Sequence, residues 1–128
     1  MNIPAADNLG LREEGGGVTI PLAPNLNDKG CLFAGSLFSG AILSAYRAAE
    51  AFLGVRALTG ELVAKTAAIS YLKRVATEGR ALATPCGDLV SKPNGNHALT
   101  VTVAVLDASG ERCAEFKAEF ILLARRQP

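Results

Sequence analysis

Residues 34–53 read AGSLFSGAILSAYRAAEAFL, and this stretch decides the fold. It carries only two charged residues, Arg47 and Glu50, both in its second half. The first half is small and apolar on all sides, which is typical of a helix buried on most of its faces. The pattern predicts one long buried helix from residue 34 to about residue 53.

Two glycines lie inside this predicted helix. Gly35 and Gly40 each weaken an isolated helix by about 1 kcal/mol relative to alanine. Their presence indicates that a sheet, a partner helix or a ligand approaches the helix backbone closely. A third glycine, Gly54, is expected to end the helix.

Strand-like runs flank the helix on both sides. The run 115–120 alternates polar and apolar residues and places both of its phenylalanines on one face. Turn signals at 92–96 and 107–110 predict that the last three strands form an antiparallel meander. The expected strands span residues 9–13, 18–22, 62–73, 79–87, 97–107 and 111–124.

A single helix cannot cover both faces of six strands. A curved antiparallel sheet wrapped around the helix satisfies both patterns, so we expect an α+β fold of this kind. The strands and helices do not alternate, which argues against a parallel doubly wound sheet. The 128 residues fit one domain, which we expect to span 1–128.

Composition narrows the class of protein. The formal net charge is +1, with 20% charged residues, so the basic surface of a nucleic-acid binder is missing. Hydrophobic residues make up 49% of the chain, which favours an oligomer that hides apolar surface. Residues 1–10 lack the pattern of a signal peptide, and the uncharged run 30–46 is too short to span a bilayer. We therefore expect a cytoplasmic protein without a membrane partner.

Metal and phosphate motifs are missing from the sequence. His97 is the only histidine, and the cysteines Cys31, Cys86 and Cys113 have no zinc-site spacing, so no metal is expected. The triple glycine at 15–17 lies between two strand-like runs, where a turn is expected rather than a phosphate-binding loop.

Residues 27–35, NDKGCLFAG, resemble the Asn-x-x-Gly-Thr-Leu-His-Gly-Gly signature of hotdog-fold acyl-CoA thioesterases. Asn27, Gly30, Leu32 and Gly35 match this signature. Cys31 stands in place of threonine, Phe33 in place of histidine and Ala34 in place of the first paired glycine.

Residues 21–39 are closer still to the putative-thioesterase domains of the YiiD C-terminal type. Residues 69–75, ISYLKRV, resemble that family's Tyr-Leu-basic-Pro-Val run, with Arg74 in place of the proline. The resemblance covers about residues 3–124. It implies a six-stranded hotdog fold and a homodimer, or a dimer of dimers, in which the strand 62–73 pairs with its symmetry mate. It also implies an acyl-CoA or acyl-carrier-protein thioester as substrate at the interface, with no cofactor beyond the coenzyme A of the substrate.

The helix start is the expected oxyanion site of such an enzyme. Backbone N–H groups near Ala34, Gly35 and Ser36 are placed to polarise a thioester carbonyl. The alternative is that Gly35 only eases the packing of the helix start.

Several side chains around the helix start are candidates for the remaining roles. Asn27 would orient the attacking water or the carbonyl, or would simply cap its loop in an Asx turn. Asp28 would act as general base, or would be a solvated turn carboxylate. The residues expected to line the substrate site are Cys31, Phe33, Ala34 and Ser39. Cys31 would be a reactive thiolate or, in the alternative, a small buried residue.

Basic residues that flank the end of the expected interface strand are candidates for the coenzyme A phosphates. Lys73, Arg74 and Arg80 could hold phosphates as a cluster of point charges. The alternative is that they form a solvated edge of the sheet.

The sequence departs from many hotdog thioesterases at the central helix. Those relatives place an Asp or Glu near the position of Ile42, where this chain has no carboxylate, and Glu50 lies two turns further on. Ser36, Ser39 and Ser44 would each need a base. The first function hypothesis is therefore a thioesterase with an unidentified base, and the second is a non-catalytic acyl- or CoA-binding protein. A dehydratase is disfavoured by Phe33 in the histidine position.

Overall fold

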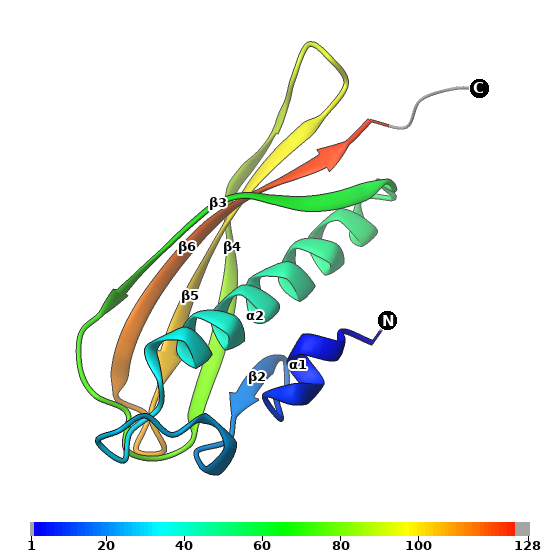
Figure 1. The fold of residues 1–128 in the computed structure, drawn as a ribbon. Helices are drawn as coiled ribbons and strands as arrows, with labels where there is room; N and C mark the ends of the chain where they lie inside the picture. Colours follow the sequence, from blue (N-terminus) through cyan, green and yellow to red (C-terminus); the bar gives the residue numbers. More distant parts are fainter. Residues whose placement is uncertain (1, 125–128) are drawn as a thin grey trace.

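The computed structural model describes residues 2–124, except for the side chain of Cys86. One long helix lies in the concave face of a curved sheet, which confirms the predicted fold class (Figure 1). The sheet is antiparallel, in the order β1-β2-β4-β5-β6-β3. The elements are α1 (Pro4–Asn8), β1 (Arg12–Glu14), β2 (Gly17–Ile20), η1 (Ala23–Asn25), α2 (Ala34–Val55), β3 (Glu61–Tyr71), β4 (Gly79–Ser91), β5 (His97–Leu106) and β6 (Arg112–Leu123).

Most strand boundaries differ from the sequence prediction by one or two residues, as at β3, which ends at Tyr71 rather than Lys73, and three differences have a clear structural basis. Residues 4–8 form the helix α1, and β1 begins only at Arg12, after a turn in which the Leu11 amide donates to the Ala6 carbonyl (3.0 Å). α2 continues through Gly54 because the chain leaves the helix at Ala57, which adopts φ 55°. β4 extends past Gly87 to Ser91, since the register shifts between Cys86 and Val90 in a bulge rather than ending the strand.

The core lies between α2 and the meander β4-β5-β6. The turn signals in the sequence predicted this meander correctly. Both phenylalanines of β6 face α2, as expected. Phe116 packs edge-on against Phe38, with centroids 5.3 Å apart, and Phe120 packs against Tyr46 at 6.1 Å. The hydroxyl of Ser44 donates to the Ala81 carbonyl (3.1 Å) and ties the helix to β4. These contacts fix the position of α2 over the sheet.

Gly40 is the point of closest approach between helix and sheet. A Cβ atom at Gly40 would overlap the side chain of Ile20, which is fully buried. Overpacking of this kind costs about 1–3 kcal/mol, against about 1 kcal/mol gained in helix propensity. Gly40→Ala should therefore lower the free energy of unfolding by up to about 2 kcal/mol, measured by denaturant titration. Gly54→Ala is the matched control, because a Cβ there meets nothing within 4 Å, and it should not destabilise the protein.

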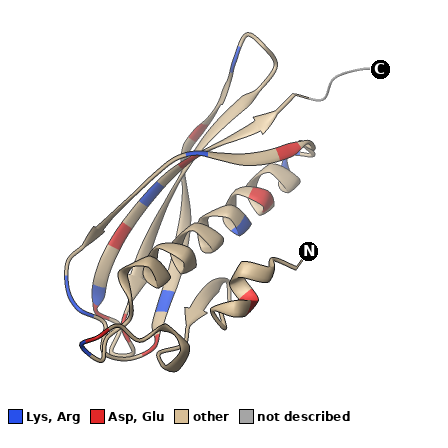
Figure 2. Ribbon diagram, in the orientation of Figure 1, with Lys and Arg blue, Asp and Glu red and all other residues tan. Residues whose placement is uncertain are grey.

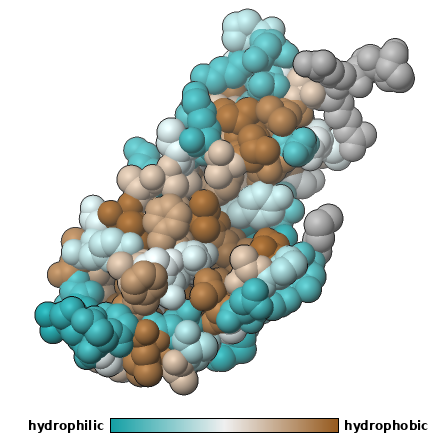
Figure 3. Space-filling view, viewed as in Figure 1, coloured by the Kyte–Doolittle hydropathy of each residue, from teal (hydrophilic) through white to brown (hydrophobic). Residues whose placement is uncertain are grey.

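The two edges of the sheet differ in character. β1 has three residues, all exposed and all charged, which blunts that edge. β3 has eleven residues, and only Glu61 and Lys65 are charged. Few charges lie along α2 and β3 in Figure 2, and apolar side chains remain on the surface in the middle of the face shown in Figure 3. β3 is thus a long and weakly protected edge strand. In the described residues, no helix is long and apolar enough to cross a membrane.

Candidate functional site

The loop before α2 is closed by Asn27. Its side-chain oxygen Oδ1 accepts hydrogen bonds from the backbone amides of Lys29 (2.8 Å) and Cys31 (3.0 Å). The backbone amide of Asn27 donates to the Cys31 carbonyl (2.8 Å). Gly30 completes the turn with φ 75°. Asn27 therefore caps the loop, while its Nδ2 group makes no hydrogen bond within residues 2–124. The Nδ2 group of Asn27 is therefore available as a hydrogen-bond donor at the helix start.

Asn25 holds the same loop through hydrogen bonds to three other segments of the chain. It is 2% exposed, and its Nδ2 donates to the carbonyls of Leu9 and Pro21, both at 2.8 Å. The backbone carbonyl of Asn25 accepts a hydrogen bond from the backbone amide of Phe33 (2.8 Å). The loop entering α2 is thus fixed by buried hydrogen bonds.

The first turn of α2 has two unused donors. The amides of Ser36 and Leu37 both donate to the Phe33 carbonyl, at 3.0 and 3.1 Å. Within the described chain, the amides of Ala34 and Gly35 have no such partner, as expected at a helix N-terminus. These free N–H groups carry partial positive charge.

Tyr71, at the end of β3, holds this turn from the side. Its hydroxyl donates to the Ala34 carbonyl at 2.8 Å. That carbonyl and the Gly35 N–H belong to one trans peptide group, so they point in opposite directions. Burial raises the pKa of Tyr71 above its ordinary value of 10.0, which keeps the hydroxyl protonated near neutral pH. The bond therefore fixes the direction of the Gly35 N–H.

A cavity of about 320 Å³ opens at this helix start. It brings together five of the predicted residues with Tyr71, to which the sequence analysis gave no role although it lies in the ISYLKRV run. The predicted residues that line the cavity are Asn27, Cys31, Ala34, Lys73 and Arg74.

The three basic candidates are in different situations. Lys73 forms an ion pair with Glu111 at 2.6 Å, and this hydrogen bond raises the pKa of Lys73. Arg80 donates to the carbonyls of Glu14 and Gly15 and thereby holds the β1–β2 turn. Arg74 is exposed and has no ion-pair partner in the part of the chain that is described. Arg74 is therefore the cation at the cavity that is available to an anion.

The remaining predicted residues, Gly35 included, do not line this cavity. The Asp28 side chain is 83% exposed and lies 3.3 Å from the Lys29 ammonium. Phe33 is 55% exposed, and its ring covers the Cα of Gly35 so that a Cβ there would touch it. Ser36 is buried in the first turn. The Ser39 hydroxyl donates to the Gly35 carbonyl at 2.9 Å.

The position of the missing carboxylate, Ile42, lines a second cavity of about 260 Å³ with Ser39. No Asp or Glu among the described residues lines either cavity. His97 contacts Ser91 at 3.2 Å near the β4–β5 turn, at the far end of the sheet from the start of α2 (Figure 1). Within one protomer, His97 therefore cannot serve the helix start.

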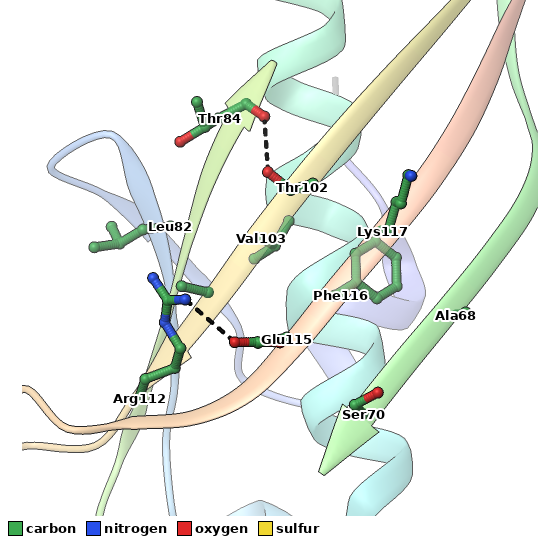
Figure 4. A pocket seen from close by; sticks show the side chains of 11 residues that line it. Ala68, Ser70, Leu82, Thr84, Thr102, Val103, Arg112, Glu115, Phe116 and Lys117 are labelled. Carbon is green, nitrogen blue, oxygen red and sulfur yellow. Dashed lines mark hydrogen bonds and ion pairs between the residues drawn. The ribbon is translucent and has the colours of Figure 1, made fainter. Parts of the chain in front are cut away.

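A wider hollow of about 510 Å³ lies on the sheet face that points away from α2 (Figure 4). Its charged residues are Arg112 and Glu115, which form an ion pair at 3.2 Å, and Lys117. None of the predicted site residues lines it. The helix start, rather than this hollow, is the candidate site.

Comparison with known proteins identifies the family and the fold. The model of the YiiD_C family, described as "Putative thioesterase", matches residues 2–124. No curated protein matches the chain.

Solved structures share the fold at low sequence identity. A "putative thioesterase" from Shewanella oneidensis has a TM-score of 0.77 at 20% identity, over 96% of this chain and 90% of the other. A "putative esterase" from Mycobacterium tuberculosis has 0.80 at 18%, over 98% and 100%. The BH2602 protein from Bacillus halodurans, solved with CoA, has 0.75 at 19%, over 96% and 78%. The chain therefore has the hotdog fold and belongs to the YiiD_C family of putative thioesterases.

Proposed function

We propose that the protein hydrolyses an acyl thioester of coenzyme A, or of an acyl carrier protein, at the start of α2. The observation that carries the proposal is the Gly35 amide, which has no partner among the described residues and whose direction Tyr71 fixes. It belongs to the helix start at which Asn27, Ala34 and Tyr71 line one cavity. The thioester oxygen would bind the Gly35 N–H, which stabilises the oxyanion of the tetrahedral intermediate. Water held by the Asn27 amide would add to the carbonyl carbon.

The leaving group needs little help from the protein. A thiol has an ordinary pKa of about 8.5, so collapse of the intermediate can release a thiolate without a general acid. Water supplies the oxygen of the carboxylic acid product and the proton that the thiolate takes up. Asp28 is a weak candidate for the base because its carboxylate is exposed and paired with Lys29. Asp28→Asn should therefore keep kcat within about twofold, measured by thiol release.

The carrier would approach over the end of β3. Arg74 offers a guanidinium there that has no ion-pair partner among the described residues, and a guanidinium is well suited to phosphate. The structurally similar BH2602 protein was solved with CoA, which supports a CoA-type carrier for the present protein.

The proposed active unit is a homodimer. The eleven residues of β3 leave one row of backbone N–H and C=O groups without a strand neighbour, which is a template for pairing with another chain. Pairing of β3 with its copy would bury this edge and bring the partner close to Tyr71 and Arg74. The missing base can then come from the partner.

The alternative is a non-catalytic acyl- or CoA-binding protein, which the lack of a lining carboxylate favours. A panel of acyl-CoAs with colorimetric detection of thiol release separates the two. Asn27→Asp keeps an oxygen acceptor for the loop amides but removes the Nδ2 donor, and should lower kcat about tenfold. Asn27→Ala tests loop and donor together. Tight binding by calorimetry without thiol release from any substrate would refute hydrolysis.

Tyr71→Phe should lower kcat about tenfold and leave KM within about twofold, because it removes the hydroxyl that orients the Gly35 amide and keeps the ring. The pH dependence gives a second readout, since the donor is lost only when Tyr71 ionises. The wild-type advantage should be constant near neutral pH and shrink above pH 10, as the raised pKa is reached. A change in KM alone, or an advantage that persists at any pH, contradicts a positioning role.

A further inference from the structure

The 260 Å³ cavity lies between α2 and the N-terminal segment that contains α1. Ile3 and Leu9 form one wall, and Ile42 and Tyr46 of α2 form the opposite wall. Ala64 of β3 and Phe120 of β6 close the floor. The N-terminal residues of this wall are half-buried. The segment therefore acts as a cover over the flank of α2.

The lining offers almost nothing to a polar ligand. Among residues 2–124, no charged residue contributes to it. The Ser39 hydroxyl is directed to the Gly35 carbonyl, and the Tyr46 ring packs against Phe120. A carboxylate placed in this cavity would lose its hydration without gaining a cationic partner among the described residues. The chemistry of the walls thus fits a hydrocarbon.

The cavity continues the helix face on which the proposed oxyanion site lies. Gly35, Ser39, Ile42 and Tyr46 follow one another at spacings of four, three and four residues, so they share one face of α2. Ile42 lies about 10 Å along the helix axis from Gly35, at about 1.5 Å per residue. A chain attached to a carbonyl at Gly35 can run along this face into the cavity.

The volume sets the length of the chain. An apolar cavity of about 150 Å³ holds a benzene molecule, so 260 Å³ holds roughly ten carbon atoms. We infer that this cavity binds the tail of the acyl group and that the substrates are uncharged, medium-length aliphatic thioesters. The inference rests on the proposed function for the position of the carbonyl. The replacement of the usual carboxylate by Ile42 then extends the hydrocarbon wall.

The test uses S-alkyl-CoA thioethers with tails of two to fourteen carbons, which cannot be hydrolysed. Calorimetry should show affinity rising about fourfold for each methylene and levelling off near ten carbons. Ile42→Ala enlarges the cavity and should move this limit up by two or three carbons. Ala6→Leu fills the cavity from the covering segment and should move the limit down by a similar amount. Ala51→Leu, a matched control on the exposed opposite face of α2, should leave it unchanged.

Opposite shifts in the two cavity variants, with folding checked by circular dichroism, support the assignment. Affinity independent of tail length, or one limit shared by all four proteins, overturns it. The corresponding acyl-CoAs, tested for thiol release, separate this result from the proposed function. A thioether series that follows the predicted pattern without any thiol release would keep the tail site and reject hydrolysis. Thiol release from every acyl-CoA, with the same dependence on tail length in all four proteins, would keep hydrolysis and reject the tail site.

Discussion

Gly35→Pro should lower kcat for thioester hydrolysis by about 10²–10³-fold, the effect of removing one oxyanion donor. The first turn of a helix tolerates proline, because its N–H groups have no partner in the helix. The Gly35 amide has no partner among the described residues, so its loss removes no structural hydrogen bond. Circular dichroism melting should therefore show a folded variant, with a lowered Tm because Ala34 is helical and the added ring meets the Phe33 side chain.

Two matched variants isolate the amide from the other properties of this position. Ala34→Pro places the same ring one residue earlier and keeps the Gly35 N–H. Phe33 is extended (φ −62°, ψ 137°), as a residue before proline should be. Its expected loss in kcat is less than tenfold. Equal losses in the two proline variants would contradict a special role for Gly35.

Gly35→Ala keeps the N–H and adds only a methyl group. That methyl group meets the ring of Phe33, which is 55% exposed and can move aside. The expected loss in kcat is less than about fivefold. If alanine lowers kcat as strongly as proline does, the glycine serves to make space and the amide is not the oxyanion donor.

The sequence predicted the parts of the fold that follow from periodic patterns. The nearly uncharged stretch 34–53 predicted α2, and the turn signals predicted the order β4-β5-β6. The helix α1 was missed because five residues are too short to show a helical period. Its role in covering the flank of α2 depends on packing against distant residues, which no local pattern reveals.

Two separate parts of the candidate site were proposed from the sequence: the loop before α2, and the basic pair Lys73 and Arg74. Asn27 and Ala34 could be proposed together because the loop and the helix start are adjacent in the chain, and both line the cavity. Tyr71 was missed as a site residue because its partner is the backbone carbonyl of Ala34, 37 positions away, and a backbone acceptor leaves no signal in a sequence.

The neighbours Lys73 and Arg74 looked equivalent in the sequence. The turn between β5 and β6 brings Glu111 to Lys73 alone, which separates their chemistry. Long-range contacts of this kind decide which charges remain available, so residue type alone could not rank the two.

The double substitution Thr66→Glu and Ala68→Glu should convert the proposed dimer into monomers and abolish hydrolysis. Both positions are exposed near the middle of β3, and their two-residue spacing places them on one face of the strand. In an antiparallel pair of β3 strands, the four carboxylates would lie near the two-fold axis. Like-charge contacts at an interface cost several kcal/mol, so the dissociation constant of the dimer should rise at least 100-fold. Analytical ultracentrifugation at micromolar concentration measures this change.

A double lysine variant at the same two positions is the matched partner of the glutamate variant. Thr66 lies opposite Glu119 and Ala68 opposite Lys117 in the β3–β6 pair, so each variant has one favourable and one unfavourable neighbour within its own chain. The two variants should therefore fold with similar stability, and each should be monomeric alone. Mixing them should restore a heterodimer and thiol release, because opposite charges then face each other across the two-fold axis. A glutamate variant that stays dimeric and active would show that β3 is not the interface, and monomers that remain active would show that the site is complete within one chain.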